Sequence, residues 1–325
     1  MRTKKCFAAL AALLASTTLC LSSCTDNGSK ITFKNYWSNA EAGTVKPINE
    51  TCEYEVSFDD YDSSFINYEL NYTGTYKTTL VSSREGDSFI YTFSTELALT
   101  TTFTVDEDTE TFKDYMISSV KFYAPGGEDN LRPISSSKEI YSHSPRITNE
   151  ASEAKDCYTF YHYRFTNDYS DGGTCIKERI FHGINEETGE EITSTAEETF
   201  TFSTSSKHNV LDNEQFPVAF RAMPTGTDNT VRMFNPYIEG TQDYDVSLSD
   251  DAEDHSVKFQ LNGETAESKK YYEASIVLSS NASGQPQTAW IAEEDAFNRI
   301  MLYYKAPLAN SIGAIEYKLK SVVKI

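Results

Sequence analysis

Hydrophobic and polar residues alternate with a period of two along two long stretches in the first third of the chain. In residues 66–80 the even positions are mainly apolar and the odd positions are polar, whereas in residues 89–105 the odd positions are mainly apolar. Successive side chains of a strand point to opposite faces, so each stretch predicts a strand with one apolar face. Strands of this length, roughly 56 Å for the second, must twist and coil. We expect Gly74, in the middle of the first strand, to mark a bend.

The segment between the two stretches predicts a tight turn. Residues 83–87 read SREGD, and Gly86 can adopt the positive φ that a hairpin turn often requires. Pairing the two strands about this turn keeps their apolar side chains on one face of the sheet. The predicted opposing pairs are Leu80 with Tyr91 and Tyr76 with Thr95.

Shorter segments along the rest of the chain show the same alternation less regularly. They predict further strands that return antiparallel to one another. Such a series indicates an all-β protein, mostly antiparallel, with one or two short helices. The segments are 112–124, 157–165, 174–182, 191–203 and 315–325.

One segment has a helical pattern instead. Residues 211–224, LDNEQFPVAFRAMP, place Phe216 and Phe220 on the same helical face. Asp212 is a suitable N-cap, and Pro217 falls near the first turn, where proline is tolerated. The sequence therefore predicts one short helix here.

The chain begins with the features of a bacterial export signal. Residues 2–5 carry three positive charges, and residues 7–21 form an uncharged run rich in Ala and Leu that is too short to span a bilayer comfortably. The run ends in Leu-Ser-Ser-Cys at residues 21–24, which resembles the lipobox of bacterial lipoproteins. The resemblance implies cleavage before Cys24 and attachment of a thioether-linked diacylglycerol to its thiol. An ordinary secretory signal that is cut elsewhere is the alternative.

These features divide the chain into three parts. We expect residues 1–23 to be the signal peptide, residues 24–45 a polar tether and residues 46–325 an antiparallel β domain. Two sub-sheets that meet near residues 205–230 are an open alternative to one continuous sheet. The acyl chains on Cys24 would hold the protein at the cell envelope, on the outer face of the cytoplasmic membrane or elsewhere outside the cytoplasm.

The acidity of the chain limits its partners. The sequence has 28 Lys and Arg against 49 Asp and Glu, a formal net charge of -21. Such a surface disfavours nucleic acid and is repelled by anionic lipid head groups. After the leader the sequence has no second apolar run long enough to span a bilayer. We therefore expect contact with the membrane through the N-terminal lipid, no nucleic-acid partner, and leave protein partners open.

The three cysteines that follow Cys24 predict neither a disulfide framework nor a metal site. An odd number cannot pair completely within the chain. Cys157 and Cys175 flank an expected hairpin, but its register places Cys157 opposite a residue near 183, which disfavours a bridge between them. Together with Cys52 they lack the spacing of zinc ligands, because the sequence has no CxxC and no HxxxH. No metal or other cofactor is predicted, and the pairing of the three thiols is left open.

Three segments carry a family resemblance: CEYEVSF at 52–58, NEQFPVAFRAMP at 213–224, and the Trp-containing run 288–319. Together they resemble a family of uncharacterised bacterial envelope proteins with a strongly curved antiparallel sheet. Their shape is similar to the half-barrels of periplasmic lipoprotein carriers, which hold acyl chains on the concave face under a helical lid. The first segment, with GTYKTTL at 74–80, also resembles uncharacterised lipoproteins of gut clostridia. The resemblance implies a half-barrel-like fold and an envelope location. The hairpin of residues 66–105 is longer than such a carrier needs, and the one helical segment leaves little for a lid.

The motifs of common enzyme classes are absent from the sequence. It has no GxSxG, HExxH, GxxxxGK[ST] or GxGxxG following a strand, so we predict no catalytic residue and a non-enzymatic protein. His162 and Arg164 lie on one face of a predicted strand with Phe160, as a polar site or as solvated side chains. Four acidic runs lack the order of a calcium-binding loop and are predicted to be solvated turns. These runs are 59–62, 106–110, 185–191 and 249–254.

The apolar face of the long hairpin is the candidate ligand-binding surface. If the sheet is an open half-barrel, this face lines a groove for a hydrophobic small molecule such as a lipid, and Phe93 and Leu99 should be more exposed than core residues. If a second layer covers it, the face is a packed core. The protein would then bind a glycan or a protein partner through exposed loop aromatics such as Trp37 and Tyr237, or be structural. The residues of this candidate face are Tyr68, Tyr72, Tyr76, Tyr91, Phe93, Leu97 and Leu99.

Overall fold

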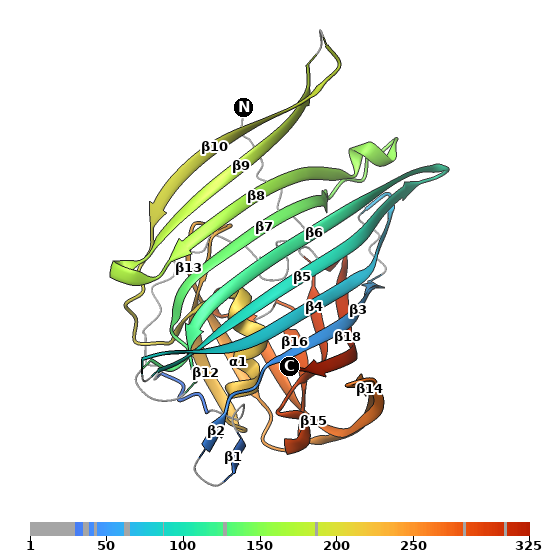
Figure 1. Ribbon diagram of the computed structural model, residues 1–325. Helices are drawn as coiled ribbons and strands as arrows, with labels where there is room; N and C mark the ends of the chain where they lie inside the picture. Colours follow the sequence, from blue (N-terminus) through green and yellow to red (C-terminus); the bar gives the residue numbers. More distant parts are fainter. Residues whose placement is uncertain are drawn as a thin grey trace.

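The computed structural model describes residues 30–34, 39–41, 44–61, 66–86, 88–125, 129–185, 188–281, 284–308 and 311–325. The predicted signal peptide, Cys24 and Trp37 lie outside the described residues. None of the helices in the described ranges is long and apolar enough to cross a membrane. The predicted fold class is confirmed, because one large, strongly curved and mainly antiparallel sheet dominates the protein (Figure 1).

The N-terminal half is a meander of long strands, each antiparallel to the next (Figure 1). A separate two-stranded hairpin, β1 and β2, precedes them. The strands are β1 (Asn39–Glu41), β2 (Thr44–Lys46), β3 (Glu50–Asp60), β4 (Glu69–Glu85), β5 (Ser88–Val105), β6 (Asp108–Tyr123), β7 (Pro133–Pro145), β8 (Tyr158–Asp168), β9 (Thr174–Ile184) and β10 (Glu191–Thr201). Two short 3₁₀ helices, η2 (Ala154–Asp156) and η3 (Ser170–Gly172), lie in the loops.

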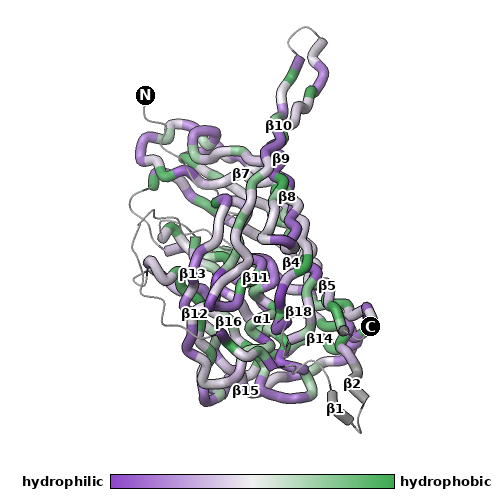
Figure 2. The backbone as a smooth tube through the Cα atoms, turned by 90° about the vertical axis from the view of Figure 1, so that its left-hand side faces the viewer, coloured by the Kyte–Doolittle hydropathy of each residue, from purple (hydrophilic) through white to green (hydrophobic). Residues whose placement is uncertain are grey.

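The C-terminal half begins with the helical segment and continues in shorter strands. Its elements are β11 (Val210–Asp212), η4 (Asn213–Gln215), α1 (Phe216–Ala222), β12 (Thr227–Asn235), β13 (Gly240–Leu248), β14 (Glu253–Leu261), β15 (Glu264–Leu278), η5 (Ser279–Asn281), β16 (Gln287–Ala292), η6 (Asp295–Phe297), β17 (Met301–Pro307) and β18 (Gly313–Lys324). Figure 2 shows β12, β13 and β16 on one side of α1, and β18 with the long strands β4 and β5 on the other side.

The two halves join in one sheet of 16 strands, ordered β10-β9-β8-β7-β6-β5-β4-β3-β18-β17-β16-β15-β13-β12-β11. β14 pairs with both β15 and β18, which closes β14 to β18 into a ring of five strands. The long strands extend from this ring as a curved layer, and β9 and β10 project beyond the rest (Figures 1 and 2). The chain crosses between the halves at residues 202–226, near the predicted meeting point, while β3 and β18 hydrogen-bond the halves together.

The long hairpin has the predicted faces but a different register. Leu80 lies opposite Phe93 and Tyr76 opposite Leu97, so the predicted partners Tyr91 and Thr95 were wrong by two residues. The cause is the turn, because Glu85 pairs with Ser88 and the turn is centred one residue later than expected. A shift of two residues preserves the alternation, so the same side chains still face the core.

Gly74 lies at a close approach between β4 and β5. It is paired with Leu99, and a β carbon at this position would stand 2.0 Å from the carbonyl oxygen of Ala98. Such a distance is far below van der Waals contact, and the atom that it meets belongs to the backbone. The absence of a side chain therefore allows the two strands to pack closely at this point.

The predicted helix is confirmed together with its cap. The Asp212 carboxylate accepts a hydrogen bond from the backbone N–H of Glu214, and the Gln215 side chain accepts one from the N–H of Asp212. This reciprocal arrangement is a capping box, which satisfies N–H groups at the start of a helix. Phe216 and Phe220 are buried with their ring centroids 4.5 Å apart, so α1 presents the expected apolar face to the core.

Part of the predicted tether belongs to the packed domain. Ile31 and Phe33 are buried in the hydrophobic core. Their backbone N–H groups donate to the side-chain oxygens of Asn209 and Asn130. The predicted boundary at residue 46 is therefore wrong for residues 30–34, because alternating apolar residues in a short polar stretch were enough to anchor it.

The three described cysteines are free and buried, so the disfavoured bridge between Cys157 and Cys175 is indeed absent. Burial raises the pKa of the Cys52 thiol to about 12 and that of Cys157 to about 11. Thiols in such surroundings stay protonated at neutral pH and are poor nucleophiles. These cysteines contribute packing rather than chemistry.

Candidate functional site

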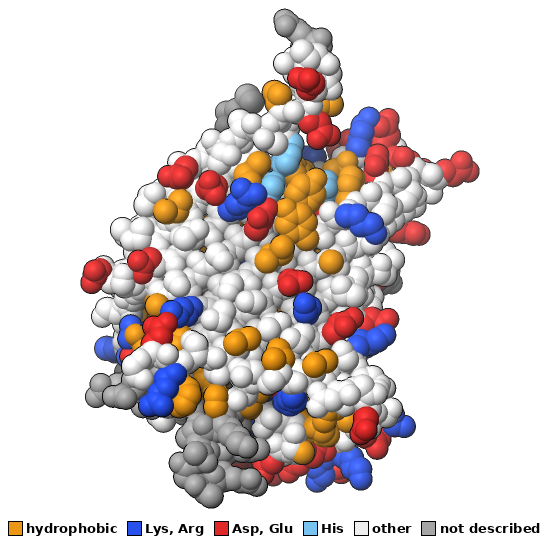
Figure 3. Space-filling view, in the orientation of Figure 1, with side chains coloured by type: hydrophobic (Ala, Val, Ile, Leu, Met, Phe, Trp, Pro, Cys, Tyr) orange, Lys and Arg blue, Asp and Glu red, His pale blue; other side chains and the backbone are white. Residues whose placement is uncertain are grey.

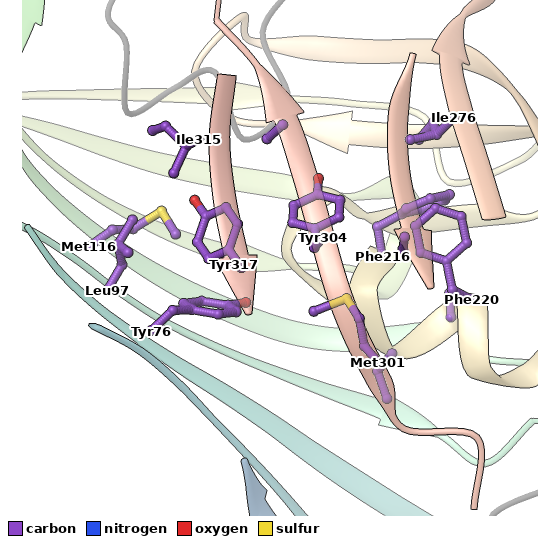
Figure 4. Packing of buried hydrophobic residues seen from close by; sticks show 14 of the residues in the cluster. Tyr76, Leu97, Met116, Phe216, Phe220, Ile276, Met301, Tyr304, Ile315 and Tyr317 are labelled. Carbon is purple, nitrogen blue, oxygen red and sulfur yellow. The ribbon is translucent and has the colours of Figure 1, made fainter. Parts of the chain in front are cut away.

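The candidate ligand-binding face is filled by the protein itself. All seven of its side chains are buried, and the exposure expected of Phe93 and Leu99 does not occur, since they are 4% and 2% exposed. The closed ring of strands supplies the opposing layer. Figure 4 shows Tyr76 and Leu97 of the long strands facing Tyr317 of β18, and the ring centroids of Tyr76 and Tyr317 are 5.1 Å apart. The structure therefore corresponds to the packed-core hypothesis for these residues.

A buried ionic network anchors α1 inside this core. Arg221 of α1 donates to the Glu50 carboxylate at 2.5 Å, and Lys324 of β18 donates to its other oxygen. Burial alone would raise the pKa of Glu50, but the attraction of Arg221 and Lys324 outweighs it and lowers that pKa. Lys138 and Glu214 form a second buried pair. These charges are paired with one another, so they support the fold and offer no open site.

The outer face of the long strands carries a cleft that combines aromatic rings with titratable groups. It has a volume of about 340 Å³, near the lower end of the range for ligand pockets. Figure 3 shows histidine and hydrophobic side chains gathered over β7 to β9, with acidic and basic side chains around them. We call this feature the outer cleft. Its main lining residues are Tyr141, His143, Phe160, His182, Glu191 and Ile192.

The course of β7 explains why His143 lies in the cleft. β7 pairs with β6 as far as Tyr141 opposite Tyr115, whereas its pairing with β8 continues to Pro145. Beyond Tyr141 the His143 ring packs beside β6, stacked on Phe112 with a centroid distance of 3.7 Å. The departure of β7 from β6 therefore creates a position between the strands that His143 occupies.

A buried carboxylate orients the His143 ring. Nδ1 of His143 lies 2.7 Å from Oδ1 of Asp114, whose side chain is fully buried. The other carboxylate oxygen of Asp114 accepts hydrogen bonds from the Thr101 hydroxyl at 2.7 Å and from the His143 backbone N–H at 3.2 Å. A carboxylate held in this way fixes both the ring orientation and the tautomer of its histidine.

A second carboxylate orients two further histidines in a chain. Nε2 of His162 lies 2.9 Å from Oε1 of Glu139, and Nδ1 of His162 lies 2.8 Å from Nε2 of His182. Glu139 also accepts from the Tyr115 hydroxyl at 2.8 Å and from Nε of Arg164 at 3.1 Å. Burial alone would raise the pKa of Glu139, but its hydrogen bonds to His162, Arg164 and Tyr115 lower that pKa. The carboxylate is therefore ionised at neutral pH.

Two aromatic rings lie between the two oriented histidines. The ring centroid of Phe160 is 4.9 Å from that of His143 and 5.4 Å from that of His182. The ring of Tyr141 lies 5.9 Å from His143 and 6.0 Å from His182, and its other neighbour Tyr115 stacks on it at 5.3 Å. The cleft thus offers half-buried aromatic surface with a hydrogen-bonding histidine on either side.

Sequence reasoning found only part of this cluster. It placed His162, Arg164 and Phe160 on one strand face, which the structure confirms: His162 and Arg164 both contact Glu139, and His162 and Phe160 both pack against Tyr141. It missed Tyr141 and His143 of β7, although their spacing of two matches that of Phe160 and His162. Tyr237, named as a loop aromatic, is half-buried against Tyr161 and Tyr163, at 6.5 and 5.6 Å between centroids.

The described residues contain no group of three or more His, Cys, Asp or Glu side chains that could hold a metal ion. The acidic runs likewise lie in turns and strand ends, although residue 62 of the first run and residues 186 and 187 of the third are outside the described ranges.

The fold and this cleft define an all-β protein with a small aromatic and histidine-lined site on the outside of its sheet. No known protein family matches the sequence, and no curated protein matches it. Among solved structures, the chain is similar to a β-barrel-like protein of a domain of unknown function, DUF1849, from Brucella abortus. The alignment covers 87% of this chain and 100% of that chain, with 10% sequence identity and a TM-score of 0.46.

Proposed function

We propose that this protein is a non-enzymatic, lipid-anchored binding protein outside the cytoplasm, and that it recognises carbohydrate through the outer cleft. The observation that carries the proposal is the placement of the Phe160 and Tyr141 rings between His143 and His182. A sugar ring has an apolar face that can pack on an aromatic ring and hydroxyl groups at its edge that need hydrogen-bonding partners. His143 and His182 lie on either side of these rings, where the hydroxyl groups of a stacked sugar would need hydrogen-bonding partners.

A hydrophobic ligand on the concave face has less support. The residues that would line such a groove are all buried in the core, and a lipid could enter only by displacing them. By contrast, the cleft residues Tyr141 and Phe160 are half-buried, so part of each ring is open to a ligand. An external site also suits a protein that is held at a membrane and meets its ligand from the solvent side.

The lipid anchor can be tested through Cys24. We expect that Cys24→Ser will release most of the protein from the membrane fraction of the producing bacterium, because the variant lacks the thiol to which the diacylglycerol would be attached. The measurement is immunoblotting of membrane and soluble fractions, with Cys52→Ser as the control. Equal membrane association of both variants would contradict the anchor.

Carbohydrate binding can be tested by calorimetry with a panel of neutral oligosaccharides. We expect Phe160→Ala to weaken binding by about tenfold or more, which corresponds to about 1.4 kcal/mol of lost contact. Phe181→Ala is the matched control, because Phe181 is an exposed aromatic residue of neighbouring β9 that does not line the cleft. It should leave affinity within twofold of the unmodified protein.

Two results would contradict this proposal. One is the same loss of affinity in both variants, which would show that the cleft is not the site. The other is a stoichiometric non-covalent lipid in an organic extract of protein purified without detergent, which would favour the concave face instead.

A further inference from the structure

The hydrogen bonds of Asp114 determine which nitrogen of the His143 ring carries the proton. Oδ2 of the Asp114 carboxylate accepts from the Thr101 hydroxyl and from the His143 backbone N–H, and Oδ1, which can also only accept, faces the His143 ring. The nitrogen that faces it, Nδ1 of His143, must then carry the proton. In the neutral ring the remaining nitrogen, Nε2, has a lone pair and can only accept a hydrogen bond.

The tautomers of His162 and His182 follow in the same way from the Glu139 carboxylate. Glu139 is an acceptor, so Nε2 of His162 donates to it and Nδ1 of His162 is left as an acceptor. Nε2 of His182 must therefore donate to Nδ1 of His162. The last nitrogen of the chain, Nδ1 of His182, is an acceptor when the ring is neutral. The half-buried Glu139 carboxylate thus sets the hydrogen-bonding character of the exposed His182 ring through His162.

Both acceptor nitrogens are available to a ligand. Within the described part of the chain, neither Nε2 of His143 nor Nδ1 of His182 has a hydrogen-bond partner, and neither is an orphaned buried atom. His143 and His182 both line the outer cleft. His143 and His182, each oriented by a different carboxylate, therefore each present a hydrogen-bond acceptor to the outer cleft.

We propose that the outer cleft holds its carbohydrate only while His143 and His182 are neutral, so that acidification releases the ligand. This inference rests on the proposed function of the cleft. In the neutral state both nitrogens accept hydrogen bonds from sugar hydroxyl groups. Protonation converts both into donors, so hydroxyl groups that pointed at them must turn away from their other partners. The two positive charges would also have to be desolvated under the bound sugar.

Several charged and titratable groups surround these two rings. Asp114 faces His143 from β6, and Glu139 and Arg164 act on His182 through His162. The full set, by element, is Asp114 and Tyr115 on β6, Glu139 and Tyr141 on β7, Tyr158, His162 and Arg164 on β8, and Glu191 on β10. A neutral sugar has no group that titrates near neutral pH. Any pH dependence of its binding therefore comes from the protein.

The premise can be tested without any ligand. Long-range ¹H–¹⁵N correlation spectra of the full-length protein at pH 7.5 distinguish a protonated imidazole nitrogen from one with a lone pair. We expect the proton on Nδ1 in His143 and on Nε2 in both His162 and His182. A proton on Nε2 of His143, or on Nδ1 of His182, would overturn the inference.

The consequence can be tested with cellohexaose, mannohexaose and N-acetylchitohexaose as neutral probes. We expect the affinity for a bound probe to fall at least about tenfold between pH 7.5 and pH 5.5, the effect of losing one or two hydrogen bonds. In His143→Gln/His182→Gln, whose amide oxygens accept at both pH values, the change should be less than twofold. His255→Asn is the control, because His255 is exposed on β14 and should leave the pH dependence unchanged.

The outcomes separate the two proposals. Binding that is equal at both pH values would overturn the proton-dependent release while leaving carbohydrate recognition in place. A pH dependence that persists in the double variant would assign it to other groups and also overturn the inference. Failure of all three probes to bind at either pH would count against the proposed function itself, whatever the tautomers are.

Discussion

Replacing Gly74 by alanine is expected to destabilise the protein by about 3 kcal/mol or more, which is at the upper end of the cost of overpacking. The new β carbon would lie 2.0 Å from the carbonyl oxygen of Ala98 and 3.0 Å from the Cα of Leu99. These are backbone atoms of a strand that is hydrogen-bonded on both sides, to β4 and to β6. Neither a rotamer change nor a small shift can relieve the contact, so the ladder itself must separate.

The measurement is the free energy of unfolding from denaturant titrations followed by circular dichroism. Gly240→Ala is the matched control, because Gly240 also lies in a strand but the nearest atom to an added β carbon is 3.9 Å away. We expect that variant to stay within about 0.5 kcal/mol of the original protein. A similarly small effect for Gly74→Ala would show that β4 and β5 are less closely packed than the structure indicates.

Removing the charge of Glu50 is expected to cost about 3–5 kcal/mol, as for other buried ion pairs that lose one partner. Glu50→Gln would leave the buried Arg221 and the half-buried Lys324 without the carboxylate that both contact. The control is Glu96→Gln, which breaks the exposed pair with Lys77 at 3.9 Å and should change stability by less than about 1 kcal/mol. If both variants unfold at the same denaturant concentration, the network does not anchor α1.

The Glu50 variant also makes a prediction about pH. The pKa of Glu50 is lowered in the folded state, so its stabilising effect is present above the unfolded pKa and is lost as pH falls through the folded pKa. The stability difference between Glu50→Gln and the original protein should therefore be largest near neutral pH and shrink as the pH falls below 4.5, the ordinary value for glutamate. Denaturant titrations at pH 7 and below pH 4 measure this difference, and a difference that grows on acidification would contradict the assignment.

The alternation of side chains was sufficient to predict the strands and their faces, because each residue of a strand points to one side whatever it pairs with. The alternation was not sufficient to predict the register of the hairpin, because the register depends on which residues form the turn. Leu80 could pair with Tyr91 or with Phe93 without changing face, and only the position of Gly86 within the turn decides. Asp212 was predicted as the N-cap of the helical segment because capping involves residues only a few positions apart.

Whether a predicted strand face is a core or a binding site depends on contacts between residues far apart in the sequence. Local sequence patterns do not reveal such contacts. Tyr76 and Leu99 form a core rather than a groove because β14 closes a ring with β15 and β18, which brings Tyr317 against them. The outer cleft likewise depends on the pairing of Tyr141 with His162 across β7 and β8. Each strand contributes one aromatic residue and one histidine two positions apart, a pattern too short to stand out before the strands are aligned.

The pairing of β3 with β18 has a consequence for how the protein is made. β3 starts the continuous sheet and β18 ends it, and the two are joined from Glu50 with Lys324 to Asp60 with Gly313. One edge of β3 therefore has no partner until β18 has been synthesised and is free to pair with it. Contacts so distant in sequence form slowly, and an uncovered edge can pair with another chain in the meantime. The newly made protein would thus depend on protection from aggregation until β18 covers this edge.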